Sequence, residues 1–289
     1  MKLEYTWDDI QARRDEIHRR TPDRALRTRA QTLRFVERVG YCFLFGSERS
    51  DLPSILNAVS GTRGVLSPDR RVRDPYFSFL AGLRDVLPKG KDVFYGKVLQ
   101  GRPSIVSLEI LPSFLALAHR LGGKEEYLNE FARGRLSPLA KQIMDTLVDT
   151  SPLDTKGLRL AILGRSRSMA APFEKAMNEL QTKMLVVNVA EEYDPAAFQW
   201  APLHRRFGKQ VRRARSMSLE VAREQILGKF FSVQVVSSVR DVQRALGWKK
   251  QLIFRTLGSL LEEGVIVASA KVEGKDSHFY AFTGQHLRA

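Results

Sequence analysis

Apolar residues recur at steps of three and four along most of the chain, which is the spacing of one face of an α-helix. Leu26 and Leu33 belong to such a pattern and predict a helix over 24–39. Thr6 precedes an amphipathic stretch and, with Asp9 three residues later, predicts the start of a helix over 7–20. Other segments expected in the N-terminal half are helices over 51–61, 74–87 and 112–120, strands over 93–99 and 104–108, a loop over 61–73 and a turn over 88–91.

Two later stretches repeat one order of elements. In the first, we expect three helices over 138–148, 156–163 and 168–184, and then a strand over 185–189. In the second, helices are expected over 219–231, 239–246 and 248–263, before strands over 265–268 and 278–282. Helix, short helix, longer helix and β-hairpin is the order of a winged helix-turn-helix. The predicted fold class is therefore mostly α with small β-hairpins, arranged as tandem winged helix-turn-helix domains.

The expected domain organisation follows from these patterns. Residues 1–135 form an N-terminal helical domain that could be a divergent winged helix, and residues 136–200 form a middle winged helix. Residues 201–217 are a basic linker, and residues 218–289 form a C-terminal winged helix. The alternative for each winged-helix domain is a small α+β domain without a ligand, or a scaffold for another protein.

Charge favours a partner that carries phosphates. The chain has 289 residues, with 47 Lys and Arg against 32 Asp and Glu, a formal net charge of +15. Hydrophobic residues make up 43% and charged residues 27%, as in an ordinary globular protein, which excludes global disorder and collagen-like repeats. Residues 201–250 hold twelve basic and three acidic residues, whereas 120–200 is neutral. Such clustering is typical of a surface that binds double-stranded DNA.

The candidate DNA-binding residues come from three places. The third helix and the wing of a winged helix usually contact DNA, and the start of a helix attracts phosphate. Two arginines precede the third helix of the middle domain, namely Arg165 and Arg167. The basic linker contributes Arg205, Arg206, Lys209, Arg212, Arg213 and Arg215. The third helix and wing of the C-terminal domain contribute Lys249, Lys250, Gln251, Arg255, Lys271, Lys275 and His278.

The sequence lacks the usual signatures of catalysis or metal binding. It contains no GxGxxG, GxxxxGK[ST] or GxSxG motif, its histidines are scattered, and one cysteine cannot anchor a zinc site, so we expect no cofactor and no metal. Cys42 lies in an apolar run and is expected in the core. Three carboxylates near apolar runs could be general bases if buried, namely Glu37, Asp51 and Glu109, although caps and surface charges are commoner. The single cysteine and the absence of a signal or membrane-spanning stretch predict a cytoplasmic protein, expected to be a monomer, that does not associate with membranes.

The chain resembles the AlkZ/YcaQ-like winged-helix DNA glycosylases, a family that repairs alkylated and crosslinked DNA. The resemblance lies in the segments 24–31, 94–117 and 173–180 and in the C-terminal winged helix. It implies tandem winged helices with a basic, concave, DNA-binding face. The family's catalytic pair is Gln-x-Gln or Gln-x-Asp, shortly after a Leu-Gly. Aligned on Val39-Gly40, the corresponding positions here are Phe43-Leu44-Phe45, which cannot orient water or stabilise a sugar cation.

The resemblance leaves three hypotheses open. The first is a DNA-binding repair protein that lacks the catalytic pair. The second is an active glycosylase for alkylated or crosslinked bases that uses other residues, and the third is a winged-helix transcription regulator. A polar or acidic residue facing the DNA near 37–45 would favour the glycosylase, and dimerisation matched to a palindromic site would favour the regulator.

Overall fold

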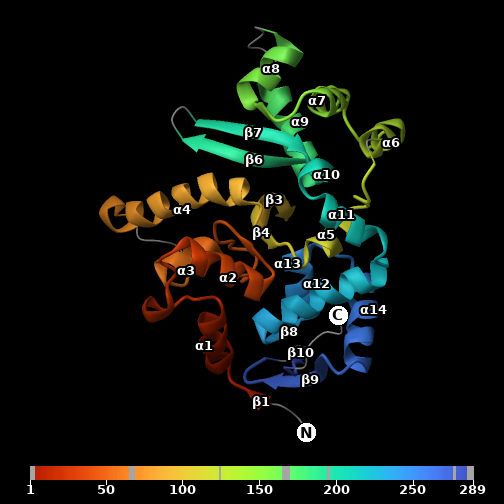
Figure 1. Cartoon of the computed structure of the whole chain (residues 1–289). Coiled ribbons are helices and arrows are strands. Elements are labelled where there is room, and N and C mark those ends of the chain that lie inside the picture. The colour runs from red at the N-terminus through yellow and green to blue at the C-terminus, as the bar shows by residue number, and fades with distance from the viewer. Residues whose placement is uncertain are drawn as a thin grey trace. The chain divides into compact units, whose positions relative to one another are not determined.

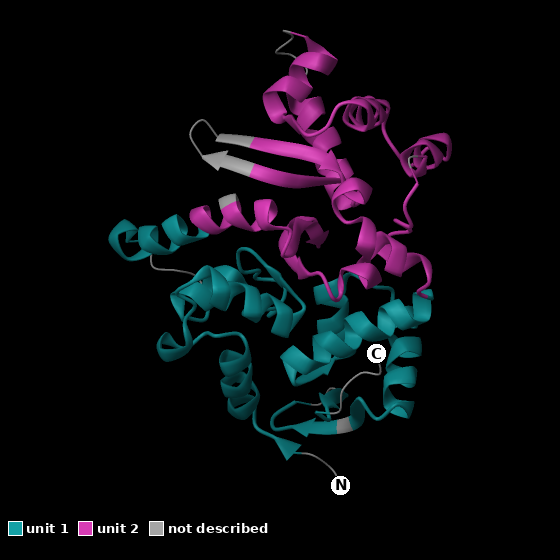
Figure 2. Cartoon of the chain, in the orientation of Figure 1, with its two compact units in different colours: residues 1–80, 218–289 teal, residues 81–217 magenta. Residues whose placement is uncertain are grey.

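The structure, a computed structural model, describes residues 4–64, 69–123, 125–164, 170–193, 196–275 and 278–284. It divides into two compact units (Figure 2), with residues 1–80 and 218–289 in unit 1 and residues 81–217 in unit 2. This division separates the first 80 residues from 81–135, which we expected in one domain. The reason lies in long-range hydrogen bonds: Arg14 donates to the carbonyl of Gln234 (2.9 Å), and the Tyr41 hydroxyl donates to that of Ile226 (3.0 Å).

The N-terminal part of unit 1 begins with β1 (Glu4–Tyr5), α1 (Trp7–Ile17), α2 (Arg29–Val39), β2 (Tyr41–Phe43) and α3 (Ile55–Ser60). The cap expected at Thr6 is confirmed, since its hydroxyl accepts from the backbone N–H of Asp9. The second helix begins five residues later than predicted. Thr28 and Gln31 form a reciprocal capping box that fixes the start of α2, and residues 22–24 form a 3₁₀ turn instead.

The remainder of unit 1, here called the C-terminal segment, is a run of six elements (Figure 1). They are α12 (Leu219–Gln234), β8 (Val236–Ser238), α13 (Val239–Leu246), α14 (Lys250–Glu262), β9 (Ile266–Val272) and β10 (Phe279–Phe282). The three strands lie in the order β9-β10-β8 with antiparallel pairing, and β1 adds a parallel strand beside β9. Strand β8 was not predicted, because three residues are too few to show a period.

Helix α4 (Arg70–Gly90) runs from residue 70 into unit 2, so it begins earlier and ends later than expected. It takes in part of the predicted loop over 61–73 and the turn expected at Pro88. The predicted hairpin follows as β3 (Val93–Leu99) and β4 (Arg102–Ser107). Next come α5 (Leu111–Leu117) and α6 (Glu126–Ala132), of which α6 was not predicted.

Unit 2 continues with a second run of six elements, here called the middle segment. They are α7 (Pro138–Asp149), β5 (Leu153–Asp154), α8 (Thr155–Leu163), α9 (Ala170–Thr182), β6 (Val186–Tyr193) and β7 (Ala196–Pro202). Its sheet has the order β5-β7-β6, which is the strand order of β8, β10 and β9 in the C-terminal segment. The mostly helical fold class with small sheets is confirmed.

Residues 201–217 are folded and are not a linker. They contain the end of β7, α10 (Leu203–Arg206) and α11 (Gly208–Arg215). The apolar residues Leu203, Phe207 and Val211 are buried, and the ring of Phe207 packs against Phe94 with a centroid distance of 5.8 Å. The arginines in this stretch concealed the apolar positions that fix both helices in unit 2. No helix among the described residues is long and apolar enough to cross a membrane.

Candidate nucleic-acid interface

A groove of about 630 Å³ lies in the C-terminal segment, between α13, α14 and β10. Two of its residues, Lys250 and His278, were candidates from sequence. The other residues that line it are Ser238, Val239, Arg240, Gln243, Phe254 and Tyr280. The groove therefore lies between the start of α14 and β10, the strand that closes the hairpin.

Local structure fixes each wall of the groove. Ser238 caps α13 in a capping box with Asp241, so α13 begins directly after β8. Phe279 pairs with Ser238 across the sheet, which brings His278 beside the start of α13. Lys250 and Phe254 are four residues apart on α14 and thus lie on one helix face.

The exposed charged side chains that line the groove are basic. Arg240, Lys250 and His278 are exposed, and no acidic side chain is among the described residues that line the groove. Phe254 is 54% exposed, although Ile253 and Leu257 on the other face of α14 are buried. A cationic groove with an exposed aromatic ring suits contact with phosphates and with an unstacked base.

The remaining candidates on α14 are exposed beside the groove. Lys249 is the N-cap residue of α14 and is exposed. Gln251 is exposed, and Arg255 lies 3.9 Å from Glu220 with its side chain 73% exposed. An exposed ion pair of this length contributes little to stability, so Arg255 remains available to a phosphate.

The structure does not bring Lys271 and Lys275 into the groove. Lys271 pairs in register with Glu4 of β1, and their charged atoms are 3.9 Å apart. The ammonium of Lys275 lies 5.6 Å from the ring centroid of Trp7. Both lysines therefore lie beside N-terminal residues and outside the groove, and the exposed ion pair of Lys271 with Glu4, like that of Arg255, contributes little to stability. The sequence pattern of the hairpin contained no sign of this added strand.

Three arginines of the expected linker donate to atoms of unit 2 itself. Arg205 donates to the hydroxyl of Ser151 (2.8 Å) and to a backbone carbonyl. Arg206 donates to the carbonyls of Pro88 and Lys89, the latter at 2.9 Å. Arg215 donates to the carbonyls of Leu121 and Gly122. These guanidinium groups hold α10 and α11 in place, which is a structural role.

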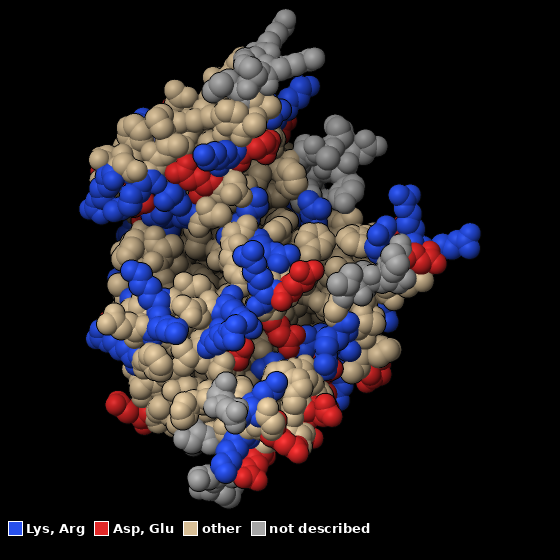
Figure 3. Space-filling view, turned by 180° about the vertical axis from the view of Figure 1, so that it is seen from behind, with Lys and Arg blue, Asp and Glu red and all other residues tan. Residues whose placement is uncertain are grey.

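The other three, Lys209, Arg212 and Arg213, are exposed on α11. Their spacing places them on one side of the helix, opposite the buried Val211 and Ala214. This side of α11 is a second basic surface. Arg165 and Arg167 lie outside the described residues. Figure 3 shows Lys and Arg interspersed with Asp and Glu over the face in view, so the basic surfaces are local patches.

A second hollow in unit 1, of about 460 Å³, exposes the carboxylate of Asp51. Asp51 accepts from Arg20 and from Arg14 (3.4 Å), both of which are buried. Arg14 also donates to the carbonyl of Val236 (2.6 Å), and His18 contacts that of Val233 (3.0 Å). These contacts join α1 to the end of α12.

Electrostatics keep Asp51 ionised. Burial alone would raise its pKa, but the hydrogen bond from Arg20 and the nearby positive charges outweigh burial and lower the pKa. Burial and the charge of Arg20 lower the pKa of His18 to about 3, so the imidazole is neutral. A carboxylate with a lowered pKa is a poor general base at neutral pH, but it can stabilise a positive charge.

The residues expected from the resemblance at the positions of the catalytic pair are apolar and packed. Phe43 and Leu44 are buried, and the ring of Phe45 lies 6.3 Å from that of Phe77. Cys42 is also fully buried, as expected, and burial raises its thiol pKa. Of the carboxylates considered from sequence, Asp51 lines the hollow of unit 1 described above, whereas Glu37 and Glu109 are exposed.

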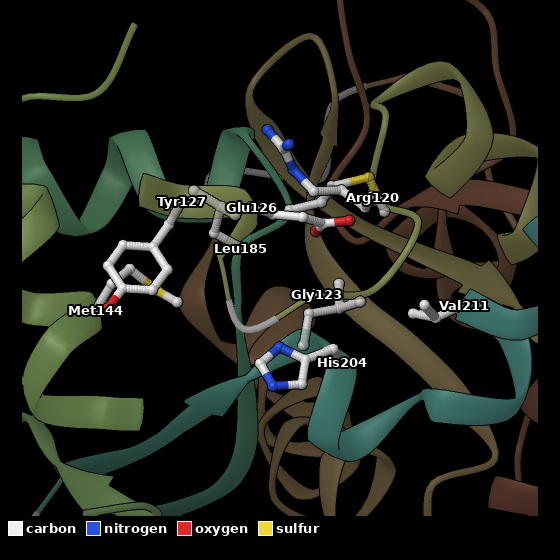
Figure 4. Close-up of a pocket in the computed structure, with 10 residues that line it drawn as sticks. Arg120, Gly123, Glu126, Tyr127, Met144, Leu185, His204 and Val211 are labelled. Carbon is white, nitrogen blue, oxygen red and sulfur yellow. The ribbon is translucent and has the colours of Figure 1, made fainter. Parts of the chain in front are cut away.

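A cavity beside Arg120, Tyr127 and His204 (Figure 4) is too small for a ligand. Its volume of about 10 Å³ leaves room for about one water molecule. Within the part of the chain that the structure describes, no three His, Cys, Asp or Glu side chains are grouped to hold a metal.

Comparison with known proteins places the chain in a family. A family model described as AlkZ related matches residues 26–247, most of the chain, which therefore belongs to the AlkZ-related family. Among solved structures, the DNA glycosylase AlkZ of Streptomyces sahachiroi is similar, with a TM-score of 0.58 and 12% identity. The similarity covers 97% of this chain and 71% of that chain, and at this identity it shows the fold alone. The curated proteins contain no match.

Sequence reasoning missed several groove residues, among them Arg240, Gln243 and Phe254. A signal for Phe254 was present, since it directly follows Ile253 and falls outside the apolar spacing of Ile253, Leu257 and Leu260. An apolar residue out of phase with its helix must face outward. Arg240 and Gln243 become neighbours of α14 only through the packing of α13.

Proposed function

We propose that this chain is a DNA-binding protein associated with DNA repair, and that it holds the duplex backbone in the groove of the C-terminal segment. The observation that carries the proposal is the groove itself, with Arg240, Lys250 and His278 along it and no acidic side chain among its described lining residues. Exposed Lys and Arg at such a surface neutralise phosphates and release their counterions.

The arrangement of elements supports a winged helix around this groove. The order α12, β8, α13, α14, β9, β10, with strand order β9-β10-β8, is the order of a winged helix-turn-helix. The third helix, α14, then contacts the major groove, and the hairpin contacts the backbone. The middle segment repeats the order and is proposed as a second winged helix.

The proposed role is binding without the family's usual catalysis. The similar Streptomyces protein is a DNA glycosylase, which supports DNA as the partner here. Phe43, Leu44 and Phe45 supply no group that could orient water. Base excision through these positions is therefore not part of the proposal.

The test is DNA binding by fluorescence anisotropy across a salt series, on plain duplex and on duplex with an abasic-site analogue. The wild-type protein should bind with steep salt dependence and prefer the damaged duplex. Replacing Arg240 and Lys250 together by Ala should weaken binding to all duplexes and flatten the salt slope by about 2 units. The absence of binding at low salt would refute the proposal.

A matched control removes two exposed basic residues that lie outside both proposed winged helices. Lys91 follows α4 and Arg133 follows α6, and both are exposed. Replacing both by Ala removes the same charge and should leave the slope unchanged. If this variant flattens the slope as much as the groove variant does, DNA binding depends on total charge and the groove is not the site.

An active glycosylase is the second candidate, and Asp51 is the observation that favours it. An ionised carboxylate at an open hollow could stabilise the sugar cation that forms when a base leaves. It ranks second because Arg14 and Arg20 offset the charge of Asp51. Incubation with alkylated duplex, followed by cleavage of abasic sites, would reveal this activity, and Asp51→Asn would abolish it.

A further inference from the structure

A cavity of about 440 Å³ lies in unit 2, beside α9 and the hairpin of β6 and β7. Its volume is within the usual range of small-molecule sites. Aromatic side chains from two hairpins line it, namely Tyr95 of β3 and Phe198 and Trp200 of β7. The function proposed above makes no use of this cavity.

Asn188 lines the cavity and carries a buried hydrogen-bond donor without a partner. The residue is 5% exposed and lines the cavity from β6. Its Oδ1 accepts from the backbone N–H of Ala190 (3.1 Å), where the register of β6 against β7 shifts. The amide group is therefore oriented with its NH₂ free to donate, and Nδ2 has no hydrogen-bond partner. Buried donors nearly always have an acceptor, so this one indicates an acceptor that enters from the cavity.

The aromatic walls favour a flat ligand. The rings of Phe198 and Trp200 lie 5.8 Å apart, with an angle of 34° between their planes. The Trp200 indole N–H already donates to the hydroxyl of Thr155 (3.0 Å), so its ring contributes a flat apolar surface. The guanidinium of Arg84 lies 5.9 Å from the Phe198 ring centroid, a distance at which the cation and the ring attract each other. Flat π-systems stack on such rings.

We propose that this cavity binds a planar heterocycle of nucleobase size, whose ring carbonyl accepts from Asn188 Nδ2 while the ring stacks on Phe198. A free nucleoside and an unstacked base in a DNA strand share this chemistry. The proposal does not depend on the groove of the C-terminal segment, because every residue that it uses belongs to unit 2.

The sharpest test compares two ligands of nearly equal size. Inosine has a carbonyl at the ring position where adenosine has an amino group, which cannot accept from Asn188. Titration calorimetry should show inosine binding at least about tenfold more tightly than adenosine, because in the same stacked pose adenosine turns an amino donor toward the Asn188 donor. Equal affinities would refute the role of Asn188, and the absence of binding by both would refute the site.

Two variants test the residues. Asn188→Asp keeps the oxygen that accepts from Ala190 and removes the donor, so inosine binding should fall by at least about tenfold. The matched control is Asn129→Asp, at an exposed position on α6, which should bind inosine as the wild type does. Phe198→Leu keeps an apolar side chain but removes the flat ring, and it should weaken inosine binding even if Asn188→Asp fails to fold. Unchanged binding in a folded Asn188→Asp or in Phe198→Leu would refute the proposal.

A third experiment distinguishes a free nucleoside from an unstacked base in a DNA strand as the ligand. Single-stranded oligo(dA) has no ring carbonyl, and one inosine within it supplies one. If the cavity takes a base from a strand, the inosine should raise oligonucleotide affinity, and Asn188→Asp should remove the gain. If free inosine binds and this gain is absent, the ligand is a free nucleoside. The Arg240/Lys250 double variant should retain the preference for inosine, so failure of the duplex proposal remains distinguishable.

Discussion

The middle segment and the C-terminal segment repeat one order of elements and one strand order, yet their side chains offer different chemistry. The groove of the C-terminal segment is lined by Arg240, Lys250 and His278, without acidic residues among those described. The cavity beside the middle segment is lined mainly by aromatic and apolar side chains and by the amide of Asn188. The comparison teaches that the order of elements sets the framework, while a few residues on the third helix and the hairpin determine what binds.

The third helices show this difference most clearly, and replacing one phenylalanine in each should give the largest effect. Phe173 of α9 is fully buried, whereas Phe254 of α14 is 54% exposed. Phe173→Ala should lower the free energy of unfolding by about 3–5 kcal/mol, because it leaves a cavity in the core. Phe254→Ala should change it by no more than about 0.5 kcal/mol. Urea unfolding of both variants measures the two values, and similar losses would show that Phe254 is a core residue.

A smaller effect on stability should distinguish two arginines of residues 201–217, one that donates to backbone carbonyls and one that is exposed. Arg206 donates to two backbone carbonyls, so Arg206→Ala should lower the free energy of unfolding by about 1–3 kcal/mol. Arg212 is exposed, and Arg212→Ala should leave stability within about 0.5 kcal/mol of the wild type. Thermal unfolding of the two variants measures both losses of stability. Equal stability would mean that the contacts of Arg206 do not hold α10 in place.

The smallest expected effect is the pH dependence of unit 1. The pKa of Asp51 is lower in the folded protein than in the unfolded chain, so its ionised form stabilises the fold above the ordinary aspartate pKa. That contribution is lost as the pH falls through the lowered pKa. Asp51→Asn should therefore be less stable than the wild type at pH 7, and the difference should shrink toward pH 3. A difference that stays constant with pH would contradict the ionised state of Asp51.

Local signals in the sequence predicted most helices but not the short strands. Caps such as Thr6 and Ser238 and the apolar spacing of α12, α13 and α14 act within a few residues, so sequence alone places these helices. Strands β5 and β8 have two and three residues and form only because a distant hairpin pairs with them. No periodic pattern can develop over so few positions.

The candidate interface was predicted only in part, and the arginines show why. A run of basic residues at 205–215 looks the same in sequence whether its members contact solvent or protein. Tertiary packing brought Arg205, Arg206 and Arg215 within hydrogen-bond distance of carbonyls in unit 2, whereas Lys209, Arg212 and Arg213 lie on the exposed side of α11. It also placed Lys271 and Lys275 beside N-terminal residues.

The sequence by itself determined the helical class, the repeated order of elements and the family resemblance, because these depend on spacing, caps and composition along the chain. Only the tertiary structure decided which cations line a groove, that residues 1–80 join the C-terminal segment, and that Asn188 lines a cavity with its amide N–H unpartnered. The physical reason is that a charged or polar side chain can be satisfied by many partners. The partner it has depends on residues far away in the chain.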